Sequence, residues 1–286
     1  MTNNGACAII YFKLCPHILD TYLSYIGWKM KTALITGASS GIGRQIAYIL
    51  AKKGYHLILV ARREDRLNEV ADYVHKKHKV QAVIKPCDLS KQEECYRLYD
   101  ECKAYKIDVL VNGAGFGLME DFVDSDLDVE MDMLNTNVRS LHILTKLFLE
   151  DMRYRTNTYI LNIASSAGLC LAGPHMSTYY ATKAYVVSLS LGVGQELKES
   201  LSPTSVSVLC PGPVDTEFND VAGASFSVKP ITASECAKTA VRGMFHKKSI
   251  IIPGTTMKLG NFAQSLVPNS IKLKVISNIQ QSKMVD

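Results

Sequence analysis

The stretch TGASSGIG at residues 36–43 decides the fold of this chain. It follows a short apolar run at 31–36, and it precedes a helical pattern at 42–53 that ends at Gly54. A strand, a glycine turn and a helix in this order direct the free amides of the helix N-terminus towards a phosphate group. A second apolar run at 56–61 completes a β-α-β unit. The sequence therefore predicts a nucleotide-binding turn.

The same alternation of apolar runs and helical patterns continues along the chain. The runs are typical of strands in a parallel sheet covered by helices on both faces, because they are apolar throughout. The predicted strands are 31–36, 56–61, 81–85, 107–111, 158–164, 204–210 and 249–252, and the predicted helices are 42–53, 64–78, 91–105, 126–152, 178–201 and 233–246. This order predicts a single α/β domain, a Rossmann-type doubly wound parallel sheet in three α/β/α layers.

Tyr179 and Lys183 lie four residues apart in one of the predicted helices, so their side chains share a face. An ammonium about 4 Å from a phenol favours the phenolate by about 4 kcal/mol at an effective dielectric near 20. That is enough to lower a tyrosine pKa from about 10 to about 7. The spacing predicts that Tyr179 is a general acid and base. The neighbouring Tyr180 has only Ala184 at the same spacing.

Several further motifs follow the glycine turn in a characteristic order. They are Asp88 after the third strand, NGAG at 112–115, Asn137, the serine pair at 165–166, Tyr179 with Lys183, and PGPVDT at 211–216. Over about residues 31–253 the chain resembles the short-chain dehydrogenase/reductase family, in its form of about 250 residues. The resemblance implies an oxidoreductase that acts on CH–OH and C=O groups. Such an enzyme interconverts a ketone or aldehyde and an alcohol with NADP or NAD.

The resemblance also implies a role for each motif. Tyr179 would exchange a proton with the substrate oxygen, and Lys183 would lower the tyrosine pKa and bind the nicotinamide ribose. Ser165 would hold the carbonyl oxygen, and Asn137 would tie a water molecule to the lysine. The implied cofactor contacts are Gly37, Ser39, Ser40, Gly41, Ile42, Gly43, Arg62, Asp88, Asn112, Ala114, Gly115, Tyr179, Lys183, Pro211, Gly212, Val214 and Thr216.

Two of these assignments have a close rival. The ungapped alignment of 160–168 favours Ser165, whereas the family's usual serine-to-tyrosine spacing fits Ser166. Ser165 requires one extra residue in 169–178. For the asparagine, Asn137 is preferred to Asn135 because the stretch that follows keeps the family's register.

Arg62 follows the second strand, at the position where an NAD-selective site carries an acid. A guanidinium can instead pair with the 2′-phosphate of NADP, so the sequence predicts a preference for NADP with NAD possible. Arg62 matches this position better than Arg63 does. Gly113 replaces the second asparagine of the family's usual motif, and we expect a looser strand end there.

Composition restricts which partners, metal sites and cellular compartments are expected for this chain. The net charge is +5 and the lysines and arginines are scattered, so we expect no nucleic-acid partner. The eight cysteines form no Cys-x-x-Cys pair and the histidines show no ligand spacing, so we expect no metal site. A long chain with such cysteines and no recognisable signal peptide suggests reduced thiols in the cytoplasm.

The ends of the chain differ from its middle. Residues 1–29 are predicted to be an extension outside the fold, 30–255 the catalytic domain, and 256–286 a segment that packs on the core or on a partner subunit. A membrane partner is not expected, because charged residues and prolines interrupt both apolar ends. We expect a small hydrophobic substrate and a homodimer or homotetramer. The alternative function is a catalytically silent nucleotide-sensing protein on the same fold.

Overall fold

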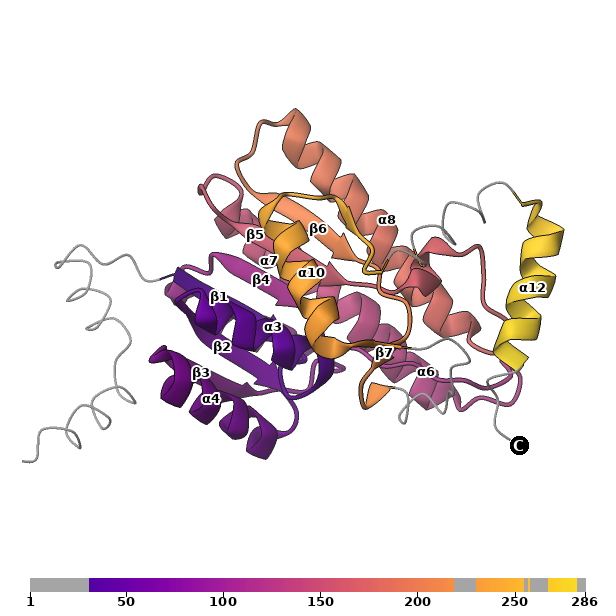
Figure 1. Ribbon diagram of the computed structural model, residues 1–286, viewed down its shortest axis with the longest axis horizontal. Coiled ribbons are helices and arrows are strands. Elements are labelled where there is room, and N and C mark those ends of the chain that lie inside the picture. The colour runs from indigo at the N-terminus through magenta and orange to yellow at the C-terminus, as the bar shows by residue number, and fades with distance from the viewer. Residues whose placement is uncertain (1–30, 219–229, 255–256, 258–266, 282–286) are drawn as a thin grey trace, which may run out of the picture.

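The computed structural model describes residues 31–218, 230–254, 257 and 267–281. A seven-stranded parallel sheet forms its centre, with strands in the order β3-β2-β1-β4-β5-β6-β9 (Figure 1). The strands are β1 (Lys31–Thr36), β2 (Tyr55–Ala61), β3 (Ala82–Pro86), β4 (Val109–Asn112), β5 (Tyr159–Ile163), β6 (Ser205–Leu209) and β9 (Ile250–Ile251). The predicted fold class is confirmed.

Helices cover both faces of the sheet because successive strand residues point to opposite sides. Ala33 and Ile35 of β1 pack with one group of helices, and Leu34 between them packs with the other group. The first group is α3 (Gly41–Lys52), α4 (Glu64–His78) and α10 (Ala233–Phe245). The second is α5 (Gln92–Cys102), α7 (Leu141–Met152) and α8 (Ser177–Glu199). Both faces are therefore buried, as the continuous apolar runs predicted.

The largest departure from the predicted elements lies at 126–152. Instead of one uniform helix, the chain forms α6 (Leu127–Leu134), a π-helical segment η2 (Asn135–Ser140) and then α7. A π-helical segment accommodates an extra residue within a turn and often occurs at functional sites. Hydrophobic periodicity does not detect it, because the segment shifts the pattern by only one residue.

Several short elements complete the described chain. They are η1 (Lys103–Tyr105), η3 (Ser166–Leu169), a small parallel pair of β7 (Val214–Asp215) with β8 (Ile231–Thr232), and α12 (Asn269–Gln281). In the predicted C-terminal segment 256–286, α12 begins directly after Pro268, as expected for a residue that breaks helices. The predicted extension at 1–29 lies outside the described residues.

The strand order reverses between β1 and β4, which are neighbours in the sheet although two strands separate them in sequence. In open parallel sheets the connecting segments diverge at this point and leave a crevice at the carboxyl ends of the strands. The crevice is therefore where a ligand site is expected.

Candidate active site

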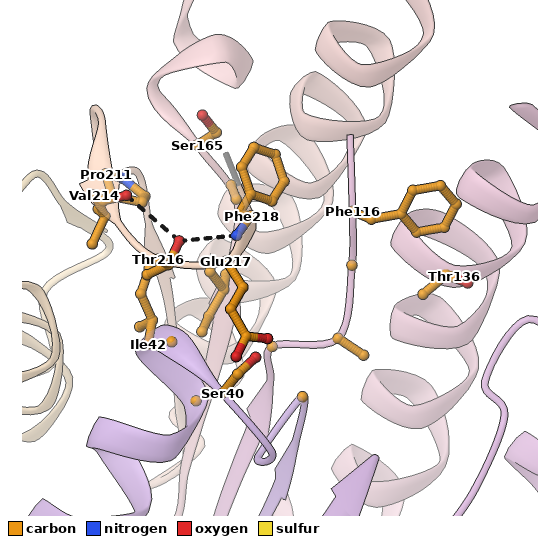
Figure 2. A pocket seen from close by; sticks show the side chains of 18 of the residues that line it. Ser40, Ile42, Phe116, Thr136, Ser165, Pro211, Val214, Thr216, Glu217 and Phe218 are labelled. Atoms are coloured by element: carbon orange, nitrogen blue, oxygen red, sulfur yellow. Dashed lines mark hydrogen bonds between the residues drawn. The ribbon is translucent and has the colours of Figure 1, made fainter. Parts of the chain in front are cut away.

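A cavity of about 460 Å³ lies in this crevice. Its walls come from the segments that follow β1, β2, β3, β4, β5 and β6, together with part of α8 (Figure 2). The lining includes these residues predicted from the sequence: Gly37, Ser39, Ser40, Gly41, Ile42, Gly43, Arg62, Asp88, Ala114, Gly115, Ser165, Tyr179, Lys183, Pro211, Gly212, Val214 and Thr216. Asn112 and Asn137 lie behind the walls. The fold thus brings residues from distant parts of the sequence to one place.

The glycine turn between β1 and α3 has a backbone that other residues would not adopt easily. Gly37 and Gly41 have φ angles of +70° and +51°, and a Cβ atom on Gly43 would lie 2.2 Å from the Gly37 carbonyl oxygen. Ser40 is the N-cap of α3 but makes no side-chain hydrogen bond to it, and the first turn contains no acid. The backbone amides at the N-terminus of α3 therefore have no side-chain cap, and the positive end of the helix dipole points into the cavity. This arrangement fits an anionic phosphate group.

The end of β4 lies tightly against the end of β1. The Thr36 hydroxyl accepts hydrogen bonds from the amides of Gly113 and Ala114, at 2.9 and 3.2 Å. A Cβ atom on Gly113 would lie 2.8 Å from the Thr36 carbonyl oxygen. The expected looser strand end is therefore wrong: the missing side chain allows two backbones to approach closely, and a hydroxyl fixes them.

Asn112 stands one residue before this contact, and its side chain turns into the protein. It is 2 % exposed, and its Nδ2 donates to Thr145 Oγ1 at 3.0 Å and to Asn162 Oδ1 at 2.9 Å. Its position suits a role in holding β4 and β5 together. Asp88 does line the cavity, although its carboxylate accepts hydrogen bonds from the amide and the hydroxyl of Ser90.

Tyr179 is almost fully buried in the cavity wall, with 7 % of its surface exposed. Burial raises its pKa to about 12, and a hydrogen bond with the Ser165 side chain acts in the opposite direction. The neighbouring Ser166 also lines the cavity, but its amide is bonded to the Pro211 carbonyl oxygen at 2.7 Å. Of the two candidate serines, the structure pairs Ser165 with the tyrosine.

Lys183 lies beside Tyr179 and is also buried, with 6 % of its surface exposed. Its Nζ donates to the Ile163 carbonyl oxygen at 3.2 Å and lies 5.6 Å from the centre of the tyrosine ring. Burial lowers the pKa of Lys183 to about 8. The predicted lowering of the Tyr179 pKa to about 7 is therefore wrong for this geometry. Desolvation penalises the charged form of both groups, and it is the largest cause of both pKa shifts.

Asn137 lies in the π-helical segment η2 and is 1 % exposed. Its amide makes two hydrogen bonds to the backbone of Phe116, at 3.0 and 2.8 Å, and a third to Thr182 Oγ1 at 3.2 Å. A Cβ atom on Gly115 would lie 2.7 Å from Asn137 Oδ1 and 3.5 Å from Lys183 Nζ. Asn137 therefore positions the segment after β4 and lies next to the lysine.

Arg63 lines the cavity and makes two polar contacts. Its Nη2 lies 2.8 Å from Glu217 Oε2 and 3.4 Å from Ser39 Oγ. Arg62, the preferred residue from the sequence, is exposed and also lines the cavity. Ser39 is buried in the glycine turn beside these cations. Two adjacent arginines therefore lie where the sequence predicted one.

The lining also includes residues that were not predicted as site residues, among them Tyr180, Glu217, Phe218 and Gln280. Gln280 of α12 is 1 % exposed and donates from its side chain to the Tyr180 hydroxyl. Phe218 packs against Tyr179, with ring centres 5.5 Å apart. Glu217 and Phe218 follow directly on the PGPVDT motif, which was the one available signal for them. Gln280 had none, because its partner is 100 residues away.

Within the described ranges of the chain, no group of three or more histidine, cysteine, aspartate or glutamate side chains has the arrangement of a metal site. The helices of the same ranges include none that is both long and apolar enough to cross a membrane.

Comparison with known proteins identifies the family. The family described as short chain dehydrogenase matches residues 31–225. The chain is 31 % identical over 283 residues to 11-beta-hydroxysteroid dehydrogenase 1A of Arabidopsis thaliana, an alignment that covers 92 % of this chain and 79 % of the relative.

Two solved structures are also similar. A short-chain dehydrogenase from Sphingobium yanoikuyae in complex with NADPH is 28 % identical with a TM-score of 0.74, over 83 % of this chain and 95 % of that one. The bulky-bulky ketone specific alcohol dehydrogenase from Comamonas testosteroni is 26 % identical with a TM-score of 0.71, over 83 % and 92 %.

The chain therefore belongs to the short-chain dehydrogenase family. The resemblance seen in the sequence is confirmed, and so is the prediction of an oxidoreductase for CH–OH and C=O groups.

Proposed function

We propose that this protein is an NADP(H)-dependent oxidoreductase that interconverts a ketone or aldehyde and an alcohol. One observation carries the proposal. The hydrogen-bonded pair of Tyr179 and Ser165 lies in the wall of the same cavity as the uncapped N-terminus of α3. An acid–base group and a phosphate-binding turn thus face one enclosed space, as a dinucleotide-dependent reaction requires.

The side chains divide the work of such a reaction. A bound nicotinamide supplies or accepts the hydride. Tyr179 is protonated at neutral pH because its pKa is raised to about 12, so it can donate a proton to a substrate oxygen. The Ser165 hydroxyl holds that oxygen against the tyrosine. Lys183, with its ammonium 5.6 Å from the ring, stabilises the phenolate that remains. Asn137 positions the wall beside Lys183.

The proposed cofactor contacts are those inferred from the sequence, except Asn112, whose side chain turns into the protein. The glycine turn and the N-terminus of α3 would hold the pyrophosphate, and Arg62 with Ser39 would hold the 2′-phosphate of NADP. We add Arg63, because its guanidinium reaches Ser39. An NADPH complex of a related dehydrogenase supports the preference, and an NAD complex in another member of the family keeps NAD possible.

The proposed substrate is a small molecule with a hydrophobic body. Phe116, Met176 and Phe218 supply apolar surface to the cavity. Two similar proteins, a hydroxysteroid dehydrogenase and an alcohol dehydrogenase specific for bulky ketones, have names that support a bulky, hydrophobic substrate. We further propose a cytoplasmic homodimer or homotetramer, in which 30–255 form the catalytic domain and 256–286 pack on it or on a partner subunit. The buried, unpaired cysteines support a reducing compartment.

A panel of hydrophobic ketones, aldehydes and alcohols, assayed with NADPH and with NADH, tests the proposal. We expect faster turnover with NADPH. Tyr179→Phe should lower kcat at least a hundredfold while the affinity for NADPH changes less than threefold, because only the transferred proton is lost. Tyr180→Phe is the matched control and should retain turnover. Undiminished turnover of Tyr179→Phe would refute the mechanism.

The two serines can be separated in the same assay. Ser165→Ala should lower kcat tenfold or more, because the orienting hydroxyl is lost, and Ser166→Ala should lower it less than threefold. The reverse order of effects would assign the catalytic role to Ser166.

A further inference from the structure

Glu217 brings a negative charge to the place where the proposed function puts the cofactor phosphate. Its carboxylate lies 2.8 Å from Arg63 Nη2 and 4.0 Å from Arg66 Nη1, and the same Arg63 nitrogen lies 3.4 Å from Ser39 Oγ. Both Glu217 and Arg63 line the cavity. In Figure 2 the Glu217 side chain extends from the segment after β6 towards the glycine turn, where Ser40 is labelled.

The charges around Glu217 are mainly cationic. The hydrogen bond to Arg63 holds the pKa of the Glu217 carboxyl below its usual range, and the charges of Arg66 and Arg44 act in the same direction. Buried Nε of Arg44 has no hydrogen-bond partner. The Glu217 carboxylate thus lies within 4.0 Å of two guanidinium groups, which leaves an excess of positive charge. Such an arrangement suits a second, more highly charged anion.

The contact between Arg63 and Glu217 is tight in geometry but open to water. Their side chains are 46 % and 43 % exposed, and an exposed ion pair is worth little because both partners remain hydrated. A phosphate group carries more charge and more acceptor oxygens than a carboxylate, so it can displace Glu217 from Arg63. The pair spans 154 residues and joins the segment after β2 to the segment after β6.

We propose that Glu217 is a specificity-determining residue that competes with the 2′-phosphate of NADP(H) for Arg63. The carboxylate occupies the guanidinium until the phosphate replaces it, so Glu217 moderates the preference for NADP(H) over NAD(H). The inference rests on the proposed function, since it requires a dinucleotide in this cavity. NAD(H) lacks the 2′-phosphate and therefore does not compete through that group, so its affinity depends on Glu217 less than the affinity for NADP(H) does.

The test is a fluorescence titration of the full-length protein with NADPH and with NADH, which needs no catalytic turnover. Glu217→Gln should bind NADPH about two- to tenfold more tightly, because the competitor and its repulsion of the phosphate are removed. Its affinity for NADH should change less than twofold. The control is Glu150→Gln, which removes the same charge from the exposed Lys146–Glu150 pair on α7 and should alter neither affinity.

A second variant tests whether Glu217 affects NADPH binding through Arg63. In an Arg63→Gln background, Glu217→Gln should improve NADPH binding less than twofold, because the contested guanidinium is gone. Weaker NADPH binding by Glu217→Gln, or equal changes for NADPH and NADH, would overturn the inference. So would an undiminished gain in the Arg63→Gln background. If the wild-type protein binds neither dinucleotide, the proposed function fails instead, and the two failures are distinguishable.

Discussion

Lys183 is a buried ammonium that the fold retains at a cost. Burial lowers its pKa from 10.5 to about 8, so keeping the ammonium charged costs free energy in the folded protein, although the ammonium is still the main form at neutral pH. Its ammonium donates a hydrogen bond to the Ile163 carbonyl oxygen and faces the ring of Tyr179. A group that is unfavourable for stability yet lies beside an acid–base side chain is typical of an active site.

Lys183→Met should therefore make the protein more stable while abolishing turnover. Removing the desolvated charge stabilises the folded state by more than the loss of the hydrogen bond destabilises it. We expect the free energy of unfolding to rise by about 1–2 kcal/mol at neutral pH. Between about pH 8 and 10.5 the unfolded chain binds more protons at this site than the folded one, so the wild-type protein gains stability as pH rises. The variant lacks this gain.

Urea unfolding of both proteins across that pH range is the measurement. The advantage of Lys183→Met should be largest below pH 8 and should shrink towards pH 10.5. Effects of all other titrating groups cancel in the difference between the two proteins. A variant that is less stable than wild type at neutral pH would show that Lys183 is compensated by contacts that outweigh its desolvation.

At the scale of single elements, the glycine turn and helix α8 show that glycines are not equivalent. A Cβ atom on Gly43 would lie 2.2 Å from the Gly37 carbonyl oxygen, so Gly43→Ala must push the turn away from β1. Gly192 is exposed in the middle of α8, and a Cβ atom placed on it would have no neighbouring atom within 4 Å. The same substitution should thus have opposite effects at the two sites.

Gly43→Ala should destabilise the protein by about 1–3 kcal/mol and weaken NADPH binding more than tenfold, because the amides of α3 lose their alignment. Gly192→Ala should stabilise it by about 0.5–1 kcal/mol, the usual gain when alanine replaces glycine in a helix, and should leave NADPH affinity unchanged. Urea unfolding and a fluorescence titration measure both quantities. Normal NADPH affinity in Gly43→Ala would mean that the turn does not hold the pyrophosphate.

The element scale also shows where pattern reading from the sequence succeeds and fails. Every predicted strand occurs within one or two residues of its predicted bounds, because apolar runs in a doubly covered sheet are continuous. The π-helical segment around Asn137 was missed, although Asn137 itself was chosen as a candidate by its register in the family. The π-helical segment is held by hydrogen bonds between Asn137 and Phe116 in the segment after β4, and such contacts between distant residues leave no periodic pattern in the sequence.

At the scale of the whole molecule, the reactivity of five buried cysteines shows whether the helices on both faces of the sheet stay packed. Cys87, Cys95, Cys102, Cys210 and Cys236 are buried, and burial raises the pKa of each thiol to between about 11 and 12. We expect none of the five to react with iodoacetamide at about pH 8 in the folded protein, because thiolate and access are both lacking. All five should react together in denaturant, since they belong to one cooperative fold.

Alkylation followed by peptide mapping measures this directly. Cys170, which is partly exposed, is the internal control and should be modified in the folded protein. Modification of any of the five at the rate of Cys170 would show that the covering helix opens locally, and it would identify which layer does so.

The sequence by itself determined the features that depend on local geometry. Glycines at 37 and 41 are required by left-handed backbone, and the spacing of Tyr179 and Lys183 places both on one helix face. Only the tertiary structure decided the contacts that join distant segments. These are the pairing of Ser165 with Tyr179, the Arg63–Glu217 ion pair and the reach of Gln280 to Tyr180. It also decided the direction of the tyrosine pKa shift, because desolvation depends on which segments fold over a side chain, and no local spacing records that.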